Sequence, residues 1–283
     1  MASNKVNVLS LFDGISCGQQ ALERLGVEVG KYYASEIDKY AISITQKNYP
    51  DTIQLGDVTK WREWDIDWAS IDLIMGGSPC QGFSMAGKQL AFDDPRSALF
   101  FVFVDIRNHI QKHNPDVKFL LENVRMKKDH LAVITEYMGV EPVMINSALV
   151  SAQNRRRLYW TNIPLGVTQP ADKGEILSDI LVNAEYEWLH DEAWNYANDK
   201  PSMQDKKAHT LRAQAGGKTK GVGVYNSDCT KWRKMTPVEC ERLQTLPDNY
   251  TEGASNSQRY KMLGNGWTVD VIKHIFGGLY GKQ

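Results

Sequence analysis

Short apolar runs alternate with segments of helical length over the first 150 residues of the chain. Apolar runs at residues 6–12, 71–76 and 118–123 are separated by segments such as 17–26 and 39–48, whose patterns are helical. Parallel strands need a long crossover connection, so this alternation predicts a doubly wound α/β fold with a mostly parallel sheet. In such sheets ligands bind at the carboxyl ends of the strands, and candidate site residues are sought there.

The pattern changes near Pro164. Trp-, Asp- and Asn-rich stretches follow, and then the Gly/Lys/Thr-rich segment 206–224, which has little helical periodicity. Beyond it, Thr236 and Pro237 are placed as the N-cap and first residue of a helix, and residues 268–279 form an amphipathic pattern. We expect one domain made of residues 1–164 plus 255–283, and a smaller domain made of residues 165–254.

Composition excludes several classes of protein. Lys and Arg total 33 against 34 for Asp and Glu, so any nucleic-acid contact must come from local patches. The four cysteines are scattered without metal-ligand spacing, which predicts free thiols and no metal site. The first residues lack the pattern of a secretory signal, and no apolar run reaches membrane-spanning length. We expect a soluble, cytoplasmic protein.

Cys80 is the candidate nucleophile. It follows an apolar run within GGSPCQGFS, between the stiff Pro79 and flexible glycines, where a strand of the predicted sheet ends. A thiolate at such a position is suited to covalent catalysis. An isolated cysteine among small residues is more often a buried, inert thiol, but the proline and glycines around Cys80 favour the reactive alternative.

Two further segments carry charged residues near strand ends. Glu122 lies at the end of an apolar run as a candidate acid, and its alternative is a carboxylate that caps the next helix. Arg155 and Arg157 alternate at the start of another strand and are predicted to share one face, where they are suited to charge-assisted hydrogen bonds. A solvated basic edge is an equally good interpretation of these two arginines alone.

The segment LFDGISCG predicts a cofactor loop between a strand and a helix. It lacks the G-x-G-x-x-G pattern, and Asp13 stands where a pyrophosphate would need main-chain N–H groups. A cationic adenosyl cofactor without phosphate fits this loop better than a dinucleotide. Glu36 is placed to bind ribose hydroxyls and Asp57 to accept from an adenine amino group. Each acid alone is more often a cap or a surface charge, but three acids at successive strand ends favour a shared site.

Several motifs occur in the order found in DNA cytosine C5-methyltransferases, and the chain resembles this family over residues 6–164 and 234–280. They are FDGISCG, SEID, GDV, GGSPCQGFS, DDPRSALFF, LLENV, QNRRRLYW, TPVECERLQTLP and LGNGWTVDVI. The resemblance implies a methyltransferase fold with a small target-recognition domain and transfer of a methyl group from S-adenosylmethionine to a flipped-out cytosine. It implies Cys80 as the nucleophile that adds to cytosine C6, Glu122 as the partner of N3, and Arg155 and Arg157 as active-site arginines. It also implies that residues after about 255 fold back onto the first domain.

Further residues are expected from the same resemblance. Those expected around the cofactor, which leaves as S-adenosylhomocysteine, are Phe12, Asp13, Gly14, Ile15, Glu36, Ile37, Asp57, Val58, Pro79, Asn265 and Trp267. Gln81 and Ser84 of the same motifs are expected to contact double-stranded DNA, and so are Arg212, Gly216, Gly217, Lys218 and Lys220, which lie outside the resemblance and are chosen from the composition of segment 206–224. Gly216 and Gly217 permit close main-chain approach to a groove, and the basic residues suit phosphates or guanine edges, although a solvated basic loop has the same composition.

Details of the motifs resemble the mammalian de novo subfamily, whereas Asn265 is of the bacterial type. We therefore expect a bacterial or phage enzyme, monomeric or homodimeric, and associated with a restriction-modification system. The alternatives are a tRNA cytosine methyltransferase and an inactive DNA-binding regulator on the same fold. Residues 100, 101 and 103, all phenylalanines, are expected in the core.

Overall fold

A computed structural model describes residues 5–79, 95–164, 169–182, 201–213 and 223–279. The contacts divide the chain into two compact units. Unit 1 contains residues 1–145, 156–167 and 275–283, and unit 2 contains residues 146–155 and 168–274. Contacts thus place residues 255–274 in unit 2, whereas the sequence-based division placed them in the first domain. That division stays a prediction about the functional domains.

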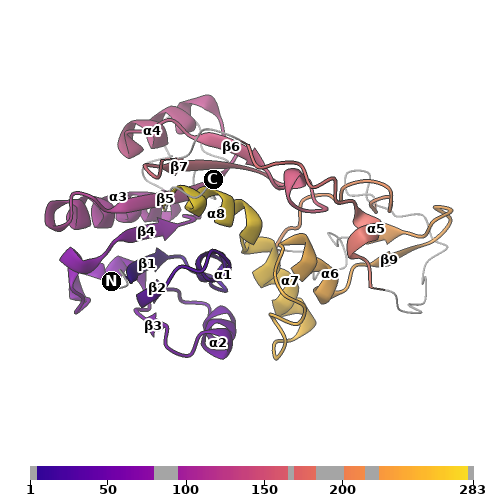
Figure 1. The fold of residues 1–283 in the computed structure, drawn as a ribbon, viewed down its shortest axis with the longest axis horizontal. Helices are drawn as coiled ribbons and strands as arrows, with labels where there is room; N and C mark the ends of the chain where they lie inside the picture. The colour runs from indigo at the N-terminus through magenta and orange to yellow at the C-terminus, as the bar shows by residue number, and fades with distance from the viewer. Residues whose placement is uncertain (1–4, 80–94, 165–168, 183–200, 214–222, 280–283) are drawn as a thin grey trace. The chain divides into compact units, whose positions relative to one another are not determined.

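One seven-stranded sheet has the order β3-β2-β1-β4-β5-β7-β6. Its strands are β1 (Val6–Leu11), β2 (Val29–Ser35), β3 (Ile53–Gln54), β4 (Leu73–Gly76), β5 (Lys118–Val124), β6 (Val143–Asn146) and β7 (Arg156–Thr161). All pairs from β3 to β5 are parallel, and β7 runs antiparallel to β5. The predicted α/β class with a mostly parallel sheet is confirmed, and β7 makes the sheet mixed (Figure 1).

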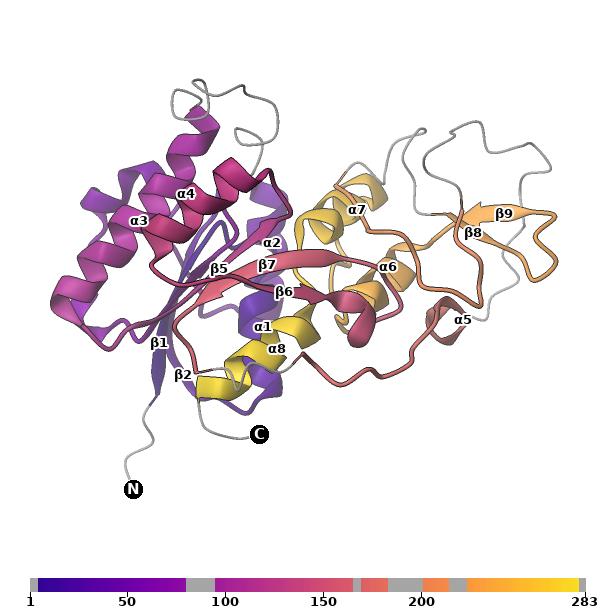
Figure 2. The same cartoon turned by 90° about the horizontal axis from the view of Figure 1, so that it is seen from above.

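Four helices of unit 1 cover the sheet. They are α1 (Cys17–Arg24), α2 (Lys39–Asn48), α3 (Pro95–His113) and α4 (Lys128–Met138). Figure 2 shows α3 and α4 on one side of the strands, and α1 and α2 on the other. Phe100 and Phe103 of α3 are fully buried and Phe101 packs against the same core, which confirms the expectation that these aromatic residues belong to the core.

Unit 2 contains most of the remaining elements. A two-stranded antiparallel sheet is formed by β8 (Gly223–Tyr225) and β9 (Trp232–Lys234). The helices are α5 (Leu177–Ile180), α6 (Pro237–Leu243) and α7 (Asn256–Asn265), and α8 (Val269–Phe276) ends within unit 1. Short 3-10 helices cover Val58–Glu63, Trp68–Ser70, Ser147–Leu149 and Gly277–Leu279.

The start of α6 matches the pattern in the sequence. The Thr236 side chain accepts a hydrogen bond from the Glu239 amide at 3.2 Å, and Glu239 accepts from the Thr236 amide at 2.8 Å. Glu239 also forms a buried ion pair with Arg233 at 2.6 Å. The predicted N-cap is confirmed, and the same glutamate joins α6 to β9. Within the described ranges, no helix is long and apolar enough to cross a membrane.

Candidate active site

The carboxyl ends of β1, β2, β4 and β5 meet at one edge of the sheet, because neighbouring strands in this series are parallel. The candidate site residues of unit 1 follow these ends directly. Asp13 follows β1, Glu36 follows β2, and Pro79 comes three residues after the end of β4. Glu122 lies inside β5, two residues before the end of that strand. The edge expected to bind ligands therefore gathers acids from separate segments.

The loop after β1 has an unusual main chain. Phe12, Gly14 and Ser16 all adopt left-handed conformations, with φ values of 56°, 62° and 57°. Left-handed conformations are costly for residues with a side chain and cluster at functional sites. The Asp13 carboxylate braces this loop, since it accepts hydrogen bonds from the Ser16 hydroxyl and, at 2.8 Å, from the Tyr32 hydroxyl of β2. Burial raises the pKa of Asp13, although these hydrogen bonds oppose the shift.

Glu36 organises the main chain around it. One carboxylate oxygen accepts from the Gly14 amide at 2.9 Å, and the other accepts from the amides of Ile37 and Asp38, each at 2.8 Å. The glutamate therefore joins the loop after β1 to the start of α2. A carboxylate has about four lone-pair positions, so Glu36 retains capacity for a ligand hydroxyl.

Next to Glu36, Ile37 exposes 77% of its surface, which leaves an apolar side chain open to solvent at the strand edge. Among the described residues, no heavy atom beyond the chain neighbours lies within 4 Å of a Cβ built on Gly14, so these residues leave the space before this glycine open. An acid with acceptor capacity, an apolar side chain and an open main chain suit the ribose and base of a nucleoside.

Asp57 has a different environment. Its Oδ1 atom accepts from the amide and hydroxyl of Thr59 at 2.9 and 2.8 Å, which lowers the pKa of Asp57 and caps the 3-10 helix Val58–Glu63. Val58 is buried, while Asp57 is exposed. The capping role that the sequence left open is present, and a role toward adenine stays a prediction.

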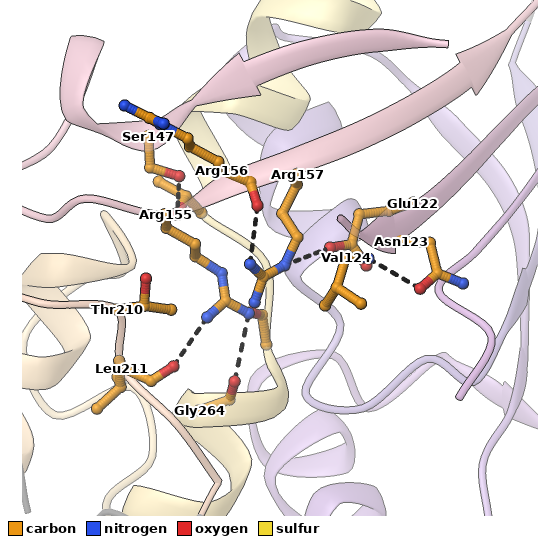
Figure 3. A network of polar contacts seen from close by, with 12 residues as sticks. Glu122, Asn123, Val124, Ser147, Arg155, Arg156, Arg157, Thr210, Leu211 and Gly264 are labelled. Carbon is orange, nitrogen blue, oxygen red and sulfur yellow. Dashed lines mark hydrogen bonds and ion pairs between the residues drawn. The ribbon is translucent and has the colours of Figure 1, made fainter. Parts of the chain in front are cut away.

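Glu122 pairs with Arg157 across two strands. The register places Glu122 opposite Tyr159 and Val124 opposite Arg157, so Glu122 and Arg157 are diagonal neighbours on one face. The Nε atom of Arg157 lies 2.9 Å from the Glu122 carboxylate, and the side chains are only 14% and 11% exposed, respectively (Figure 3). Arg157 also donates to the main-chain oxygen of Arg156 at 3.0 Å. The two predicted residues are thus brought together by antiparallel pairing.

Asn123 connects this pair to the segment after β4. Its side-chain amide donates to the carbonyl and hydroxyl oxygens of Ser78 at 3.3 and 3.4 Å, while its own oxygen accepts from the Val124 amide. Ser78 comes two residues before Cys80. Cys80, Gln81 and Ser84 lie outside the described residues, so the chain is followed to Pro79, which is exposed.

Arg155 is placed within unit 2, before β7 begins. Its guanidinium donates to three main-chain carbonyls, those of Leu211 at 2.9 Å, Gly264 at 3.3 Å and Gly266 at 2.9 Å. The residue is 3% exposed. These contacts are structural in kind, and a direct catalytic role for Arg155 stays a prediction.

The other expected residues have mixed positions. Ile15 is buried and Phe12 is half-buried in unit 1, whereas Asn265 is exposed and Trp267 is half-buried at the end of α7 in unit 2. Arg212 is exposed. The remaining residues expected to contact DNA, Gly216, Gly217, Lys218 and Lys220, lie outside the described part of the chain.

The sequence did not indicate several residues that shape this edge. Tyr32 and Ser16 hold Asp13, and Ser78 is held by Asn123. Tyr32 lies in the middle of a strand pattern, where a tyrosine usually signals packing alone, so no local signal identified it. Ser78 lies within the recognised motif GGSPCQGFS, and its position two residues before Cys80 was the available clue.

The fold, with acids at the carboxyl edge of a doubly wound sheet, is of the kind that suits an enzyme with a nucleoside-type ligand. The sequence profile of the C-5 cytosine-specific DNA methylases matches residues 6–164 and 159–280. The chain belongs to this family and is a DNA (cytosine-5)-methyltransferase.

Bacterial proteins resemble it over nearly the whole of this chain. Type II methyltransferase M.NlaX of Neisseria lactamica is 29% identical, with 95% of this chain and 94% of the relative covered. Type II methyltransferase M1.ScrFI of Lactococcus lactis subsp. cremoris is 31% identical, with 96% and 77% covered.

Solved structures share the fold. The Entamoeba histolytica methyltransferase EhMeth superimposes with a TM-score of 0.78 at 17% identity, and 98% of each chain is covered. A Spodoptera frugiperda DNMT2 variant superimposes with a TM-score of 0.73 at 18% identity, with 98% of this chain and 100% of that chain covered.

Proposed function

We propose that this methyltransferase acts through a covalent adduct between the Cys80 sulfur and C6 of a flipped-out cytosine in double-stranded DNA, with S-adenosylmethionine as the methyl donor. The observation that carries the proposal is the pair of contacts made by adjacent residues of β5. Glu122 binds Arg157, and Asn123 binds Ser78, two residues before Cys80. The end of β5 therefore contacts both Arg157, through the acid Glu122, and Ser78, which precedes Cys80 by two residues.

The other cysteines support this assignment by their environments. Cys240 is fully buried, and burial raises its pKa, so its thiolate is strongly disfavoured. Cys17 is 3% exposed within α1. Cys229 is exposed, but it lies on the turn between β8 and β9 in unit 2. Among these three, only Cys229 is accessible to a substrate, which makes it the matched control.

Cytosine C5 is a weak nucleophile, and addition of a thiolate at C6 converts the ring into an enamine that is reactive at C5. We assign Cys80 to this attack. After C5 has taken the methyl group, its proton passes to a base such as water, the C5–C6 double bond re-forms, the S–C6 bond breaks and the thiolate is regenerated. Glu122 holds a proton at cytosine N3, which relieves the charge that builds on the ring during addition. Arg157 orients Glu122 and supplies a positive charge close to the O2 and N3 edge of the base.

The cofactor assignment fits the residues present. Glu36 retains acceptor capacity for the ribose hydroxyls, and exposed Ile37 offers an apolar contact to adenine. Asp57 follows the carboxyl end of β3, which pairs in parallel with β2. Asp13 holds the loop and adds negative charge, which suits a sulfonium rather than a phosphate. When bound, S-adenosylmethionine supplies an electrophilic methyl group and becomes S-adenosylhomocysteine. Family membership supports this donor.

DNA recognition is assigned to the small domain, with Arg212 and the lysines at 218 and 220 as contacts to phosphates or base edges. The bacterial relatives are named type II methyltransferases, which supports an enzyme of the restriction-modification class. We assign this enzyme to the cytoplasm, as a monomer or a homodimer. The family match favours DNA over the tRNA alternative.

The decisive experiment uses DNA carrying 5-fluorocytosine, because fluorine cannot leave C5 as a proton does. The protein should form a complex with this DNA that survives denaturing electrophoresis, and Cys80→Ala should abolish both the complex and methylation while DNA binding persists. Cys229→Ala should retain both. Turnover by the Cys80→Ala variant would refute the proposal.

A further inference from the structure

The end of helix α7 leaves main-chain carbonyls without partners inside the helix, as every helix end does. Side chains from distant segments of unit 2 bind them. Arg155 donates to the carbonyls of Gly264 and Gly266, and Gln244 donates to those of Leu263 and Gly266 at 2.7 and 3.1 Å. A cation is also favourable at a helix C-terminus. The turn that carries Asn265 is therefore held by buried side chains.

The guanidinium of Arg155 reaches a second segment at the same time. It donates to the Leu211 carbonyl at 2.9 Å (Figure 3). The Leu211 amide donates to the Gln153 side chain at 3.1 Å. Gln153 in turn donates to the Gln244 side chain at 3.0 Å. The rigid fork of an arginine is suited to bridging acceptors on two segments, which a lysine cannot reproduce.

Main-chain packing joins the same two segments directly. A Cβ atom on Gly264 would lie 2.1 Å from the Arg212 carbonyl carbon and 2.2 Å from the Ala213 nitrogen. A glycine is therefore needed at position 264 for α7 to lie this close to the main chain of Arg212 and Ala213. Leu211, Gly264 and Gly266 are buried, whereas Arg212 and Asn265 between or beside them are exposed. Each exposed side chain is thus presented by buried anchors.

We propose that Arg155 is a positioning residue that ties the Leu211–Ala213 segment to the end of α7, so that Arg212 and Asn265 are presented by one rigid piece of unit 2. The inference rests on the proposed function, in which Arg212 contacts DNA and Asn265 contacts S-adenosylmethionine. Under it, DNA recognition and cofactor binding depend on the same buried guanidinium.

Hydrogen exchange tests the tie without reference to activity. In Arg155→Lys, the amides of residues 211–213 and 264–266 should lose protection together, since a single ammonium cannot span both segments. The matched control is Arg156→Lys, because Arg156 is the exposed neighbour. It should leave protection unchanged. Protection that is unchanged in Arg155→Lys, or lost in one segment alone, would overturn the proposal, whether or not the chain methylates DNA by the assigned mechanism.

Kinetics then separate positioning from catalysis. Arg155→Lys should raise KM for S-adenosylmethionine about tenfold, equivalent to roughly 1.4 kcal/mol, and broaden the set of methylated sites. The single-turnover rate at saturating cofactor and DNA should be retained. A fall in that rate with unchanged KM would make Arg155 a catalytic residue and refute the positioning role.

Gly264→Ala disrupts the same contact between α7 and the Leu211–Ala213 segment, because its methyl group must displace the Arg212–Ala213 main chain. It should reproduce the exchange pattern and the rise in KM. Since both substitutions break one contact, the double variant should be little worse than the more severe single variant. Fully additive effects on KM, in variants whose thermal unfolding remains cooperative, would show that Arg155 and Gly264 act separately and overturn the proposal.

Discussion

The Glu122–Arg157 pair can be tested by separating its stability from its chemistry. At a separation of 2.9 Å the attraction amounts to about 6 kcal/mol with an effective dielectric constant near 20, and desolvation of two charges offsets much of it. Breaking a buried pair by removing one partner costs roughly 3–5 kcal/mol, because the other charge is left uncompensated. The side chains are 14% and 11% exposed, so we expect the lower end for Arg157→Met.

Glu122→Gln is a milder change to stability. The glutamine oxygen can still accept from the Arg157 Nε atom, so we expect a loss of about 1 kcal/mol in the free energy of unfolding. Urea denaturation of both single variants and the double variant gives the coupling between the residues. We expect a coupling energy of about 1–2 kcal/mol, and additive losses would show that the pair does not form in solution.

The chemical effect of Glu122→Gln should be much larger. A glutamine can donate to cytosine N3 but cannot transfer a proton, and general acid catalysis contributes about 10²- to 10⁴-fold. The single-turnover rate should fall by that factor under conditions where the variant is fully folded, while the DNA dissociation constant changes little. A variant that kept the full single-turnover rate would show that Glu122 serves only the ion pair.

Glu36→Gln should weaken S-adenosylmethionine binding by roughly 1.5–3 kcal/mol in calorimetry, since a glutamine NH₂ group cannot accept from the amides that Glu36 holds, whereas the rate at saturating cofactor should change less; unchanged affinity would remove Glu36 from the cofactor site. Gly76→Ala should cost about 1–3 kcal/mol in urea denaturation, because its Cβ would lie 2.8 Å from the Leu11 carbonyl oxygen, and wild-type stability would contradict this packing. The pKa of Asp13 is raised by burial above 3.8, so the folded state binds its proton more tightly, and its contribution to stability is lost as the pH rises through the folded pKa. Asp13→Asn should therefore flatten the decline in unfolding free energy that begins near pH 3.8, and an identical pH profile would refute the assignment.

Much of the sheet domain follows from local pattern. The runs at residues 6–12, 71–76 and 118–123 appear as strands β1, β4 and β5, and the helical segments 17–26 and 39–48 contain α1 and α2. Parallel order then places Asp13 and Glu36 at one edge, as their positions after strands indicated. The N-cap at Thr236 also follows from sequence, because capping depends on residues within one turn.

The strain in the loop after β1 could not be predicted. Phe12 and Ser16 take left-handed conformations that their residue types disfavour. Contacts with other segments hold them there, including the Asp13 bond to Tyr32 and the Asp13 amide bond to the Ser35 carbonyl. Such contacts depend on how β1 and β2 pair and leave no local signal.

Arg155 and Arg157 show most clearly which features the sequence predicts and which depend on the tertiary structure. The sequence by itself predicted a strand that begins at Arg155, with Arg157 two residues further on, whereas β7 begins at Arg156 and contains Arg157 alone of the two. Tertiary structure decided their different partners. Arg157 meets Glu122 because β7 runs antiparallel to β5, whereas Arg155 precedes the strand and binds carbonyls that lie 56, 109 and 111 residues away in the chain. Alternation along a strand encodes which face a side chain takes, but the partner on that face is set by long-range pairing.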